Sequence, residues 1–135
     1  MRYYTTTDPY EVASLHKAEI LESTGKCDYA IEAIVDKWKS VRGNTFGVAI
    51  EGIAVGFIAY QNNENCIYIS DLYICPEYRR MGLARNLIMH IDNSAFKIRL
   101  KVDVKNVNAI KLYKSVGFIL EKIDNNRLDM VKNRC

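Results

Sequence analysis

Positive charge and small residues come together directly ahead of a predicted helix, in residues 79–85. The first amides of a helix have no partner within it and carry positive partial charge, so helix starts bind anions. Gly82 and Ala84 leave the backbone bare enough to approach a pyrophosphate, while Arg79 and Arg80 add charge. The pattern is neither a Walker loop nor the G-x-G-x-x-G of dinucleotide sites. It therefore predicts a site for another phosphate-bearing cofactor.

Asp71 is a second residue that could carry chemistry, because it interrupts the nearly continuous apolar run from Cys66 to Ile74. A carboxylate in such a strand must be ion-paired, hydrogen-bonded or shifted in pKa, which is typical of a residue in a functional site. A purely structural role would explain it equally well.

The cysteine pattern argues against a metal site. Four cysteines are present: Cys27, Cys66, Cys75 and Cys135. They show neither paired C-x-x-C spacing nor a nearby histidine pattern, so we expect reduced packing cysteines and no bound metal. The less favoured alternative, a cysteine nucleophile, would require His16 or His90 close by in the fold.

Charge and hydropathy exclude several classes of protein. The net charge of +3 is small and no run of five basic residues occurs, which argues against nucleic acid as a partner. No run of about eighteen apolar residues occurs, and residues 1–5 lack the apolar stretch of a secretory signal. We therefore expect a soluble, cytoplasmic protein without a membrane partner.

The charges are unevenly distributed along the chain. Residues 8–40 carry seven acidic and four basic side chains, whereas residues 41–135 carry nine acidic and fourteen basic ones. One part of the surface could therefore suit a cation and the other an anion. Solvated helix faces are the alternative explanation.

The elements that must position these residues fit within one domain, since the chain has 135 residues of which 49% are hydrophobic. A strand over 2–6 is followed by a helix that begins at Pro9 and ends at Gly25. The predicted apolar stripe of this helix is Val12, Leu15, Ile20 and Leu21. A second helix is predicted from Asp28 to about residue 41.

The rest of the chain alternates between strand and helix patterns. Strands are predicted over 45–50, 53–60, 66–74, 96–104, 118–123 and 127–131, with a polar turn over 61–65. Helices are predicted over 82–93 and from a cap at Asn106 to a stop at Gly117. The order β-αα-βββ-α-β-α-ββ predicts an α/β fold, a mixed sheet with helices on both faces.

Two motifs resemble the signatures of the GCN5-related N-acetyltransferase (GNAT) family. Arg79-x-x-Gly82-x-Ala84, with the strand and proline turn of residues 70–78 ahead of it, is similar to the family's coenzyme A loop. The family's second signature is resembled, at the usual spacing, by residues 100–118, which read Leu100-x-Val102-x-x-x-Asn106-x-x-Ala109-Ile110-x-Leu112-Tyr113-x-x-x-Gly117-Phe118. The resemblance implies a single GNAT-like domain over residues 1–135 that uses acetyl-CoA as co-substrate.

The resemblance also implies roles for particular residues. The backbone near Leu72 and Ile74 would hold the pantetheine arm beside a strand that splays away, and the amide near Leu72 would polarise the thioester carbonyl. The pyrophosphate would lie on the amides of residues 80–85. These residues are Arg80, Met81, Gly82, Leu83, Ala84 and Arg85. Asn106 would contact the pantetheine arm while also capping its helix.

Acetyl transfer to an amine requires a base to deprotonate the ammonium and an acid to protonate the departing thiolate. Tyr113 aligns with the family's general-acid tyrosine, although a half-buried core aromatic is the alternative. Ser70 stands where the polyamine-acetylating relatives have a glutamate, so no base carries over at that position. Asp71 acting through water, or an acid on the early helices such as Glu22, stays open.

The acidic bias of residues 8–40 favours a cationic acceptor, such as a polyamine, an aminoglycoside or a lysine-type amine, and a protein amine is also open. The alternative is a non-catalytic domain that binds acyl-CoA as a sensor or interaction module. An enzyme that acetylates aminoacyl-tRNA is disfavoured by the small net charge. The hairpin over 118–131 could pair two subunits, so a homodimer is possible.

Overall fold

The computed structural model describes residues 2–5, 9–25, 44–50, 53–64, 66–91 and 97–133. Its strands are β1 (Arg2–Thr5), β2 (Asn44–Ile50), β3 (Ile53–Asn63), β4 (Cys66–Ile74), β5 (Lys97–Asp103), β6 (Ile119–Asp124) and β7 (Arg127–Asn133). Its helices are α1 (Pro9–Thr24), α3 (Leu83–Ile91), α4 (Val107–Ser115) and the short 3₁₀ turn η1 (Pro76–Tyr78).

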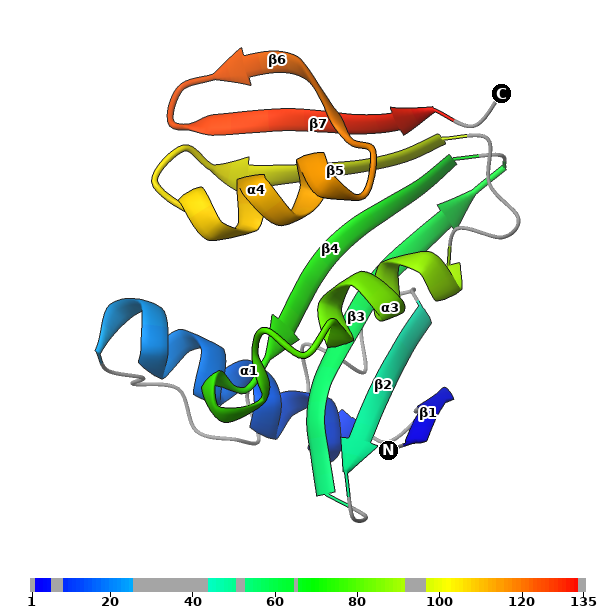
Figure 1. The fold of residues 1–135 in the computed structure, drawn as a ribbon, viewed down its shortest axis with the longest axis vertical. Helices are drawn as coiled ribbons and strands as arrows, with labels where there is room; N and C mark the ends of the chain where they lie inside the picture. Colours follow the sequence, from blue (N-terminus) through cyan, green and yellow to red (C-terminus); the bar gives the residue numbers. More distant parts are fainter. Residues whose placement is uncertain are drawn as a thin grey trace.

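The described strands form one seven-stranded mixed sheet in the order β1-β2-β3-β4-β5-β7-β6 (Figure 1). β4 and β5 are parallel, and every other neighbouring pair is antiparallel. The parallel pairing joins only Cys66–Ile69 to Lys97–Leu100. Beyond these residues the two strands diverge, as Figure 1 shows, and leave a gap in the strand pairing beside the carboxyl-terminal half of β4.

A β-bulge changes the direction in which the side chains of β4 point. Ile69 pairs with Tyr60 and Asp71 pairs with Ala59, so Ser70 is an extra residue in the ladder. Its hydroxyl donates a 3.1 Å hydrogen bond to the carbonyl of Ala59. Ile69 packs into the large core cluster, whereas the odd-numbered residues after the bulge point to the opposite face of the sheet.

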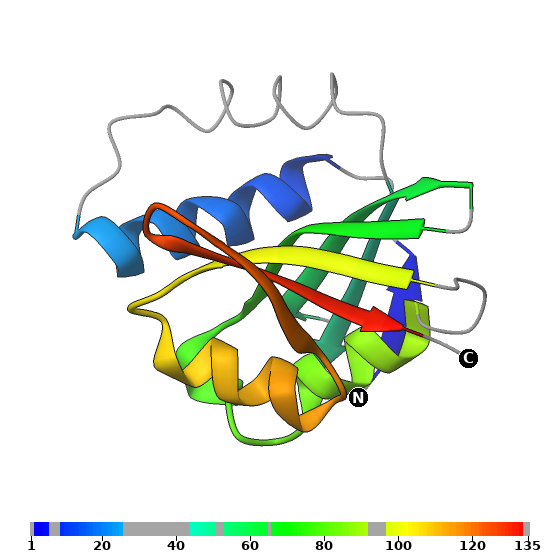
Figure 2. The same cartoon turned by 90° about the horizontal axis from the view of Figure 1, so that it is seen from above.

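Helices cover both faces of the sheet (Figure 2). α3 and α4 lie on one face, over a core that includes Ile58, Leu87 and Leu100. α1 lies on the other face, where Leu15 packs against Tyr73 of β4 and its neighbours on β3. Among the described helices, none is long and apolar enough to span a membrane.

The predicted mixed sheet with helices on both faces is confirmed. The positive φ of 78° at Gly25 and 107° at Gly117 fits their predicted role as helix stops. The predicted turn over 61–65 is wrong at its start, since β3 continues to Asn63 because its polar end still pairs with β4. The predicted stripe of α1 is also wrong at Leu21, which is 44% exposed. The predicted helix after Asp28 lies outside the described residues.

Candidate active site

The loop between β4 and α3 makes a tight turn at the carboxyl end of a buried strand. After the turn η1, Arg80 and Gly82 both adopt left-handed backbone conformations, with φ of 64° and 80°. For Arg80 this conformation is uncommon, and such residues cluster at functional sites. The amide of Asn86 donates to the carbonyl of Gly82 at 3.0 Å, so the hydrogen bonding of α3 starts at Gly82.

The start of α3 presents backbone amides from a rigid base. Leu83 is buried in the core, so its amide has a fixed position at the first turn of the helix. Arg85 donates from its guanidinium to the carbonyl of Ser115 at 2.9 Å, which ties α3 to the end of α4. Arg80 and Met81 are exposed just ahead of the helix. This helix start can bind a diphosphate through its first amides and its positive partial charge.

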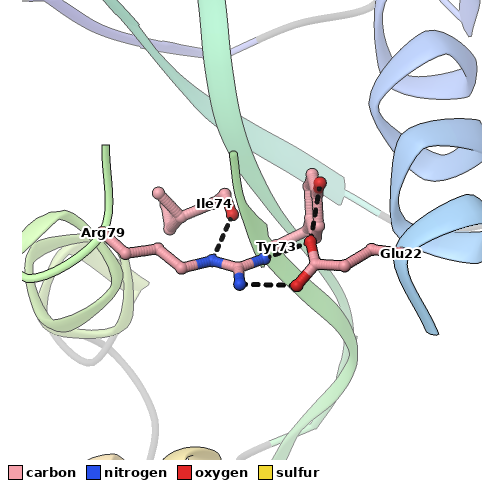
Figure 3. A network of polar contacts seen from close by, with 4 residues as sticks. All are labelled: Glu22, Tyr73, Ile74 and Arg79. Atoms are coloured by element: carbon pink, nitrogen blue, oxygen red, sulfur yellow. Dashed lines mark hydrogen bonds and ion pairs between the residues drawn. The ribbon is translucent and has the colours of Figure 1, made fainter. Parts of the chain in front are cut away.

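The side chain of Arg79 points to α1 and β4 (Figure 3). Its Nε donates to the carbonyl of Ile74 at 2.9 Å, and its two terminal nitrogens each contact one carboxylate oxygen of Glu22 at 2.5 Å. Tyr73 donates its hydroxyl to the same carboxylate at 3.2 Å, and the guanidinium lies 5.6 Å from the centre of the Tyr73 ring. Arg79 therefore joins the end of β4 to α1.

This network changes the acid–base properties of its members. The hydrogen bonds from Arg79 lower the pKa of Glu22, so its carboxylate is a weaker base than an ordinary glutamate. Burial, followed by the negative charge of Glu22, raises the pKa of Tyr73 to about 12. Because Glu22 is engaged in a bidentate ion pair, it is a poor candidate for the base that the sequence left open.

The edge of β4 that is not paired with β5 carries backbone groups that do not face β3. The amide of Cys75 donates to the carbonyl of Val55 on β3 at 2.8 Å. Because backbone groups alternate in direction along a strand, those of Leu72 and Ile74 point away from β3, toward the gap that β5 leaves. The carbonyl of Ile74 agrees with this direction, since it accepts the hydrogen bond from Arg79.

His16, Glu19 and Asp71 form a polar cluster between α1 and β4. The Nδ1 atom of His16 lies 3.2 Å from a carboxylate oxygen of Glu19 and 3.9 Å from one of Asp71. The side chain of His16 is 11% exposed, whereas those of Glu19 and Asp71 are 27% and 24% exposed. Asp71 faces α1 because the bulge at Ser70 turns it there.

Tyr113 contributes the remaining polar group from α4. It is buried, with its ring packed edge-on against Phe118 at a centroid distance of 5.7 Å. Burial, followed by the negative charges of Glu19 and Asp71, raises the pKa of Tyr113 to about 12. Its phenol therefore stays protonated at neutral pH, and Asp71 is near enough to influence it electrostatically. The charges of Glu19 and Asp71 thus act on this predicted site residue.

The remaining predicted positions have mainly local roles in the structure. Asn106 caps α4 as predicted, with its Oδ1 accepting a 3.3 Å hydrogen bond from the amide of Ala109. Burial raises the pKa of Cys75, which keeps it a thiol and disfavours it as a nucleophile. The sequence reasoning did not assign His16 and Glu19 to the site. Their spacing of three residues, which places both on one side of a helix, was the available signal.

Comparisons with known proteins point to one family. The model of the acetyltransferase (GNAT) family matches residues 9–118. Thialysine N-epsilon-acetyltransferase of Bos taurus is 30% identical over 84 residues, which are 58% of this chain and 49% of that protein. The chain thus spans about half the length of this curated relative.

Solved structures share the fold over nearly the whole chain. PaiA N-acetyltransferase from Thermoplasma acidophilum, solved in complex with coenzyme A, has a TM-score of 0.77 and 18% identity, covering 99% of this chain and 100% of that chain. The ribosomal-protein-S18-alanine N-acetyltransferase from Escherichia coli has a TM-score of 0.72 and 20% identity, covering 98% and 92% of the two chains.

Proposed function

The chain belongs to the acetyltransferase (GNAT) family, and from this premise we propose that it transfers the acetyl group of acetyl-CoA to an amine. The observation that carries the proposal is the gap between β4 and β5, which ends at the loop ahead of α3. An extended pantetheine arm needs such an unpaired strand edge, and a diphosphate needs such a helix start.

In this proposal the cofactor lies along β4 and reaches α3. The backbone groups of Leu72 and Ile74 bind the pantetheine arm, with the amide near Leu72 polarising the thioester carbonyl. The amides of residues 80–85 bind the pyrophosphate. Asn106 contacts the arm through its amide nitrogen, because its Oδ1 already accepts the cap hydrogen bond.

The reaction is direct attack of the amine on the thioester in a ternary complex. Asp71 takes a proton from the acceptor amine, and Tyr113 donates its phenolic proton to the departing thiolate. The burial of Tyr113 supports this assignment, because burial, followed by the charges of Glu19 and Asp71, raises the pKa of its phenol to about 12 and keeps it protonated at neutral pH. Ser70 takes no part, because its hydroxyl is bonded to the backbone at the bulge.

The acceptor in this proposal is the amine of a small cationic molecule or of a protein. The curated relative is named for thialysine and one structural neighbour for a protein alanine, so the family serves both kinds of acceptor. A cytoplasmic location stays a prediction from the sequence. So does a homodimer through the hairpin over 118–131, whose edge strand β6 has Ile119 and Ile123 59% and 62% exposed.

Two measurements on the purified protein test the proposed function. Acetyl-CoA should raise the melting temperature, because a ligand that binds only the folded state stabilises it. Release of CoA should then depend on an amine, tested with a polyamine, an aminoglycoside, lysine and a peptide with a free amino terminus. Stabilisation without turnover on any amine would favour the non-catalytic acyl-CoA-binding module. A melting temperature that acetyl-CoA does not change would refute the proposal.

A further inference from the structure

We propose that Glu19, Asp71 and His16 form the acceptor site, in which the two carboxylates bind the amine as an ammonium ion and His16 positions both of them. This inference rests on the proposed acetyl transfer and narrows its substrate to amines that arrive protonated. It assigns functions to two residues of α1, His16 and Glu19, and gives Asp71 a partner in binding.

The geometry of the cluster suits a single cationic group. One imidazole nitrogen and two carboxylate oxygens, one from each residue, lie within 4.8 Å of one another, with Glu19 on α1 and Asp71 on β4. An ammonium has three N–H donors, so it can satisfy two carboxylates at once and still present one N–H to a third group. Because both carboxylates are about a quarter exposed, they are open to a ligand, whereas His16 lies behind them.

The charge of the cluster favours a cation rather than a neutral amine. The two carboxylates bring negative charge to a partly buried place, where electrostatic attraction is stronger than in water. These charges also oppose ionisation of Tyr113. A bound ammonium offsets them, so an acceptor in this site would make Tyr113 a more effective acid. Binding of the acceptor and protonation of the leaving group are thereby coupled.

The protons balance along this route. The bound ammonium carries three: one passes to the carboxylate of Asp71 and from there to solvent, since this side chain is 24% exposed. The freed amine nitrogen forms the C–N bond as the C–S bond breaks, and Tyr113 gives its proton to the thiolate. A second amine proton restores the phenol of Tyr113, and the third stays on the amide nitrogen. The products are the acetamide, CoA and one released proton.

His16 lies between the two elements that carry the carboxylates. Its imidazole faces Glu19 on its own helix and Asp71 on β4, with the apolar side chains of Phe57 and Ala59 on β3 under the same helix. Because the imidazole lies close to both carboxylates, it fixes their separation. Its removal should therefore raise the KM for the amine.

The first test separates acceptor binding from cofactor binding. Glu19→Gln and Asp71→Asn should each raise the KM for the amine about tenfold or more, since each removes a charged hydrogen-bond partner. Asp71→Asn should also lower kcat. The stabilisation by acetyl-CoA should not change in either variant. Glu64→Gln, in the turn between β3 and β4 at the far end of β4, is the matched control and should keep the wild-type KM.

The second test replaces His16, the positioning residue. His16→Gln should raise the KM for the amine without changing kcat or the stabilisation by acetyl-CoA, a split that a general loss of structure would not produce. This comparison still tests the acceptor site if a carboxylate variant fails to fold. An unchanged KM in both carboxylate variants, or an unchanged KM in His16→Gln, would overturn the acceptor site.

The outcomes also distinguish failure of the proposed function from failure of the acceptor site. Absence of turnover by the wild-type protein on every amine would refute the proposed function itself, whereas turnover with unaltered KM in the variants would refute only the acceptor site. Zn²⁺ is the competing ligand, because one imidazole and two carboxylates are also a metal-binding set. Tight stoichiometric binding of ZnCl₂, lost in Asp71→Asn, would make the cluster a metal site and overturn the proposal.

Discussion

Replacing Glu22 by Gln should loosen the attachment of α1 to the end of β4 and lower the stability of the fold. The substitution keeps the size of the side chain but removes the charge that pairs with both terminal nitrogens of Arg79. It also weakens the acceptor of the Tyr73 hydroxyl. A double-mutant cycle with Arg79→Gln isolates the energy of the pair from the other contacts of each residue.

The structure limits the size of this coupling. The side chains of Arg79 and Glu22 are 42% and 40% exposed, so water and salt screen them, and exposed pairs are worth about 0.2–1 kcal/mol. Bidentate geometry is the most favourable arrangement, which puts the coupling near the upper end, at about 1 kcal/mol. For a chain of this length that energy corresponds to a shift in melting temperature of about 4 °C.

Urea denaturation of the four proteins of the cycle measures the coupling energy, and a second ion pair in the same chain provides the control. Arg99 and Glu121 are 44% and 41% exposed, nearly the same as the first pair, but they make one contact at 3.4 Å. Their coupling should be close to zero. If the Glu22–Arg79 coupling were no larger than that of Arg99–Glu121, the argument that the bidentate contact holds α1 to β4 would be refuted.

The sign of the pH dependence gives a further check on the same pair. The pKa of Glu22 is lower in the folded chain than its ordinary value of 4.5, so the stabilisation is present at neutral pH. It is lost as the pH falls through the folded pKa, because the unfolded chain binds the proton more readily. As the pH is lowered from 6 toward acid unfolding, the free energy of unfolding of Glu22→Gln should therefore fall less than that of the wild-type protein. An identical acid dependence would contradict this.

Three further predictions concern the cofactor site and the acid. Gly82 and Gly25 have φ of 80° and 78°, with open space around both. Replacing either by Ala should lower the free energy of unfolding, measured by urea denaturation, by about 1–2 kcal/mol. Only Gly82→Ala should also weaken the stabilisation by acetyl-CoA. Tyr113→Phe should lower turnover about 10²-fold without affecting acetyl-CoA binding. It should also reduce the loss of stability between pH 10 and pH 12 that follows from a folded pKa of about 12 against 10.0 unfolded. Asn106→Asp should keep the helix cap, whereas Asn106→Ala should lower the free energy of unfolding by about 1 kcal/mol. Both variants should weaken acetyl-CoA binding, because both remove the amide nitrogen that is proposed to contact the pantetheine arm.

The local signals in the sequence predicted most of the element order correctly. Gly117 ends α4, and Asn106 caps it, because both roles depend on the backbone of a few neighbouring residues. The end of β3 was mispredicted for the opposite reason. Its polar residues up to Asn63 read as a turn, but pairing with Cys66 and its neighbours keeps them in the sheet. Pairing between strands is not visible in local composition.

The surroundings of Arg79 could not be predicted from its motif. Its charge and its position ahead of a helix suggest a phosphate ligand, yet its guanidinium binds Glu22, which is 57 residues away in the chain. The motif describes the backbone of the loop well, because Gly82 has the left-handed φ that the pattern requires. Where a long side chain goes depends on the partner that the fold brings to it, and that partner is on α1.

The partner helix carries His16 and Glu19, which the sequence reasoning did not assign to the site, and Glu22, which it left open as the base. His16, Glu19 and Glu22 follow one another at intervals of three residues, so they lie along one side of α1 and interrupt its apolar pattern. Across from them on β4, Asp71 and Tyr73 are two residues apart and point to the same face of the sheet after the bulge. The row on the helix therefore contacts the row on the strand twice, once at the proposed acceptor site and once at the attachment of the cofactor loop. A shift of α1 along β4 would disturb both contacts together, and this makes the position of one helix a determinant of both proposed substrate sites.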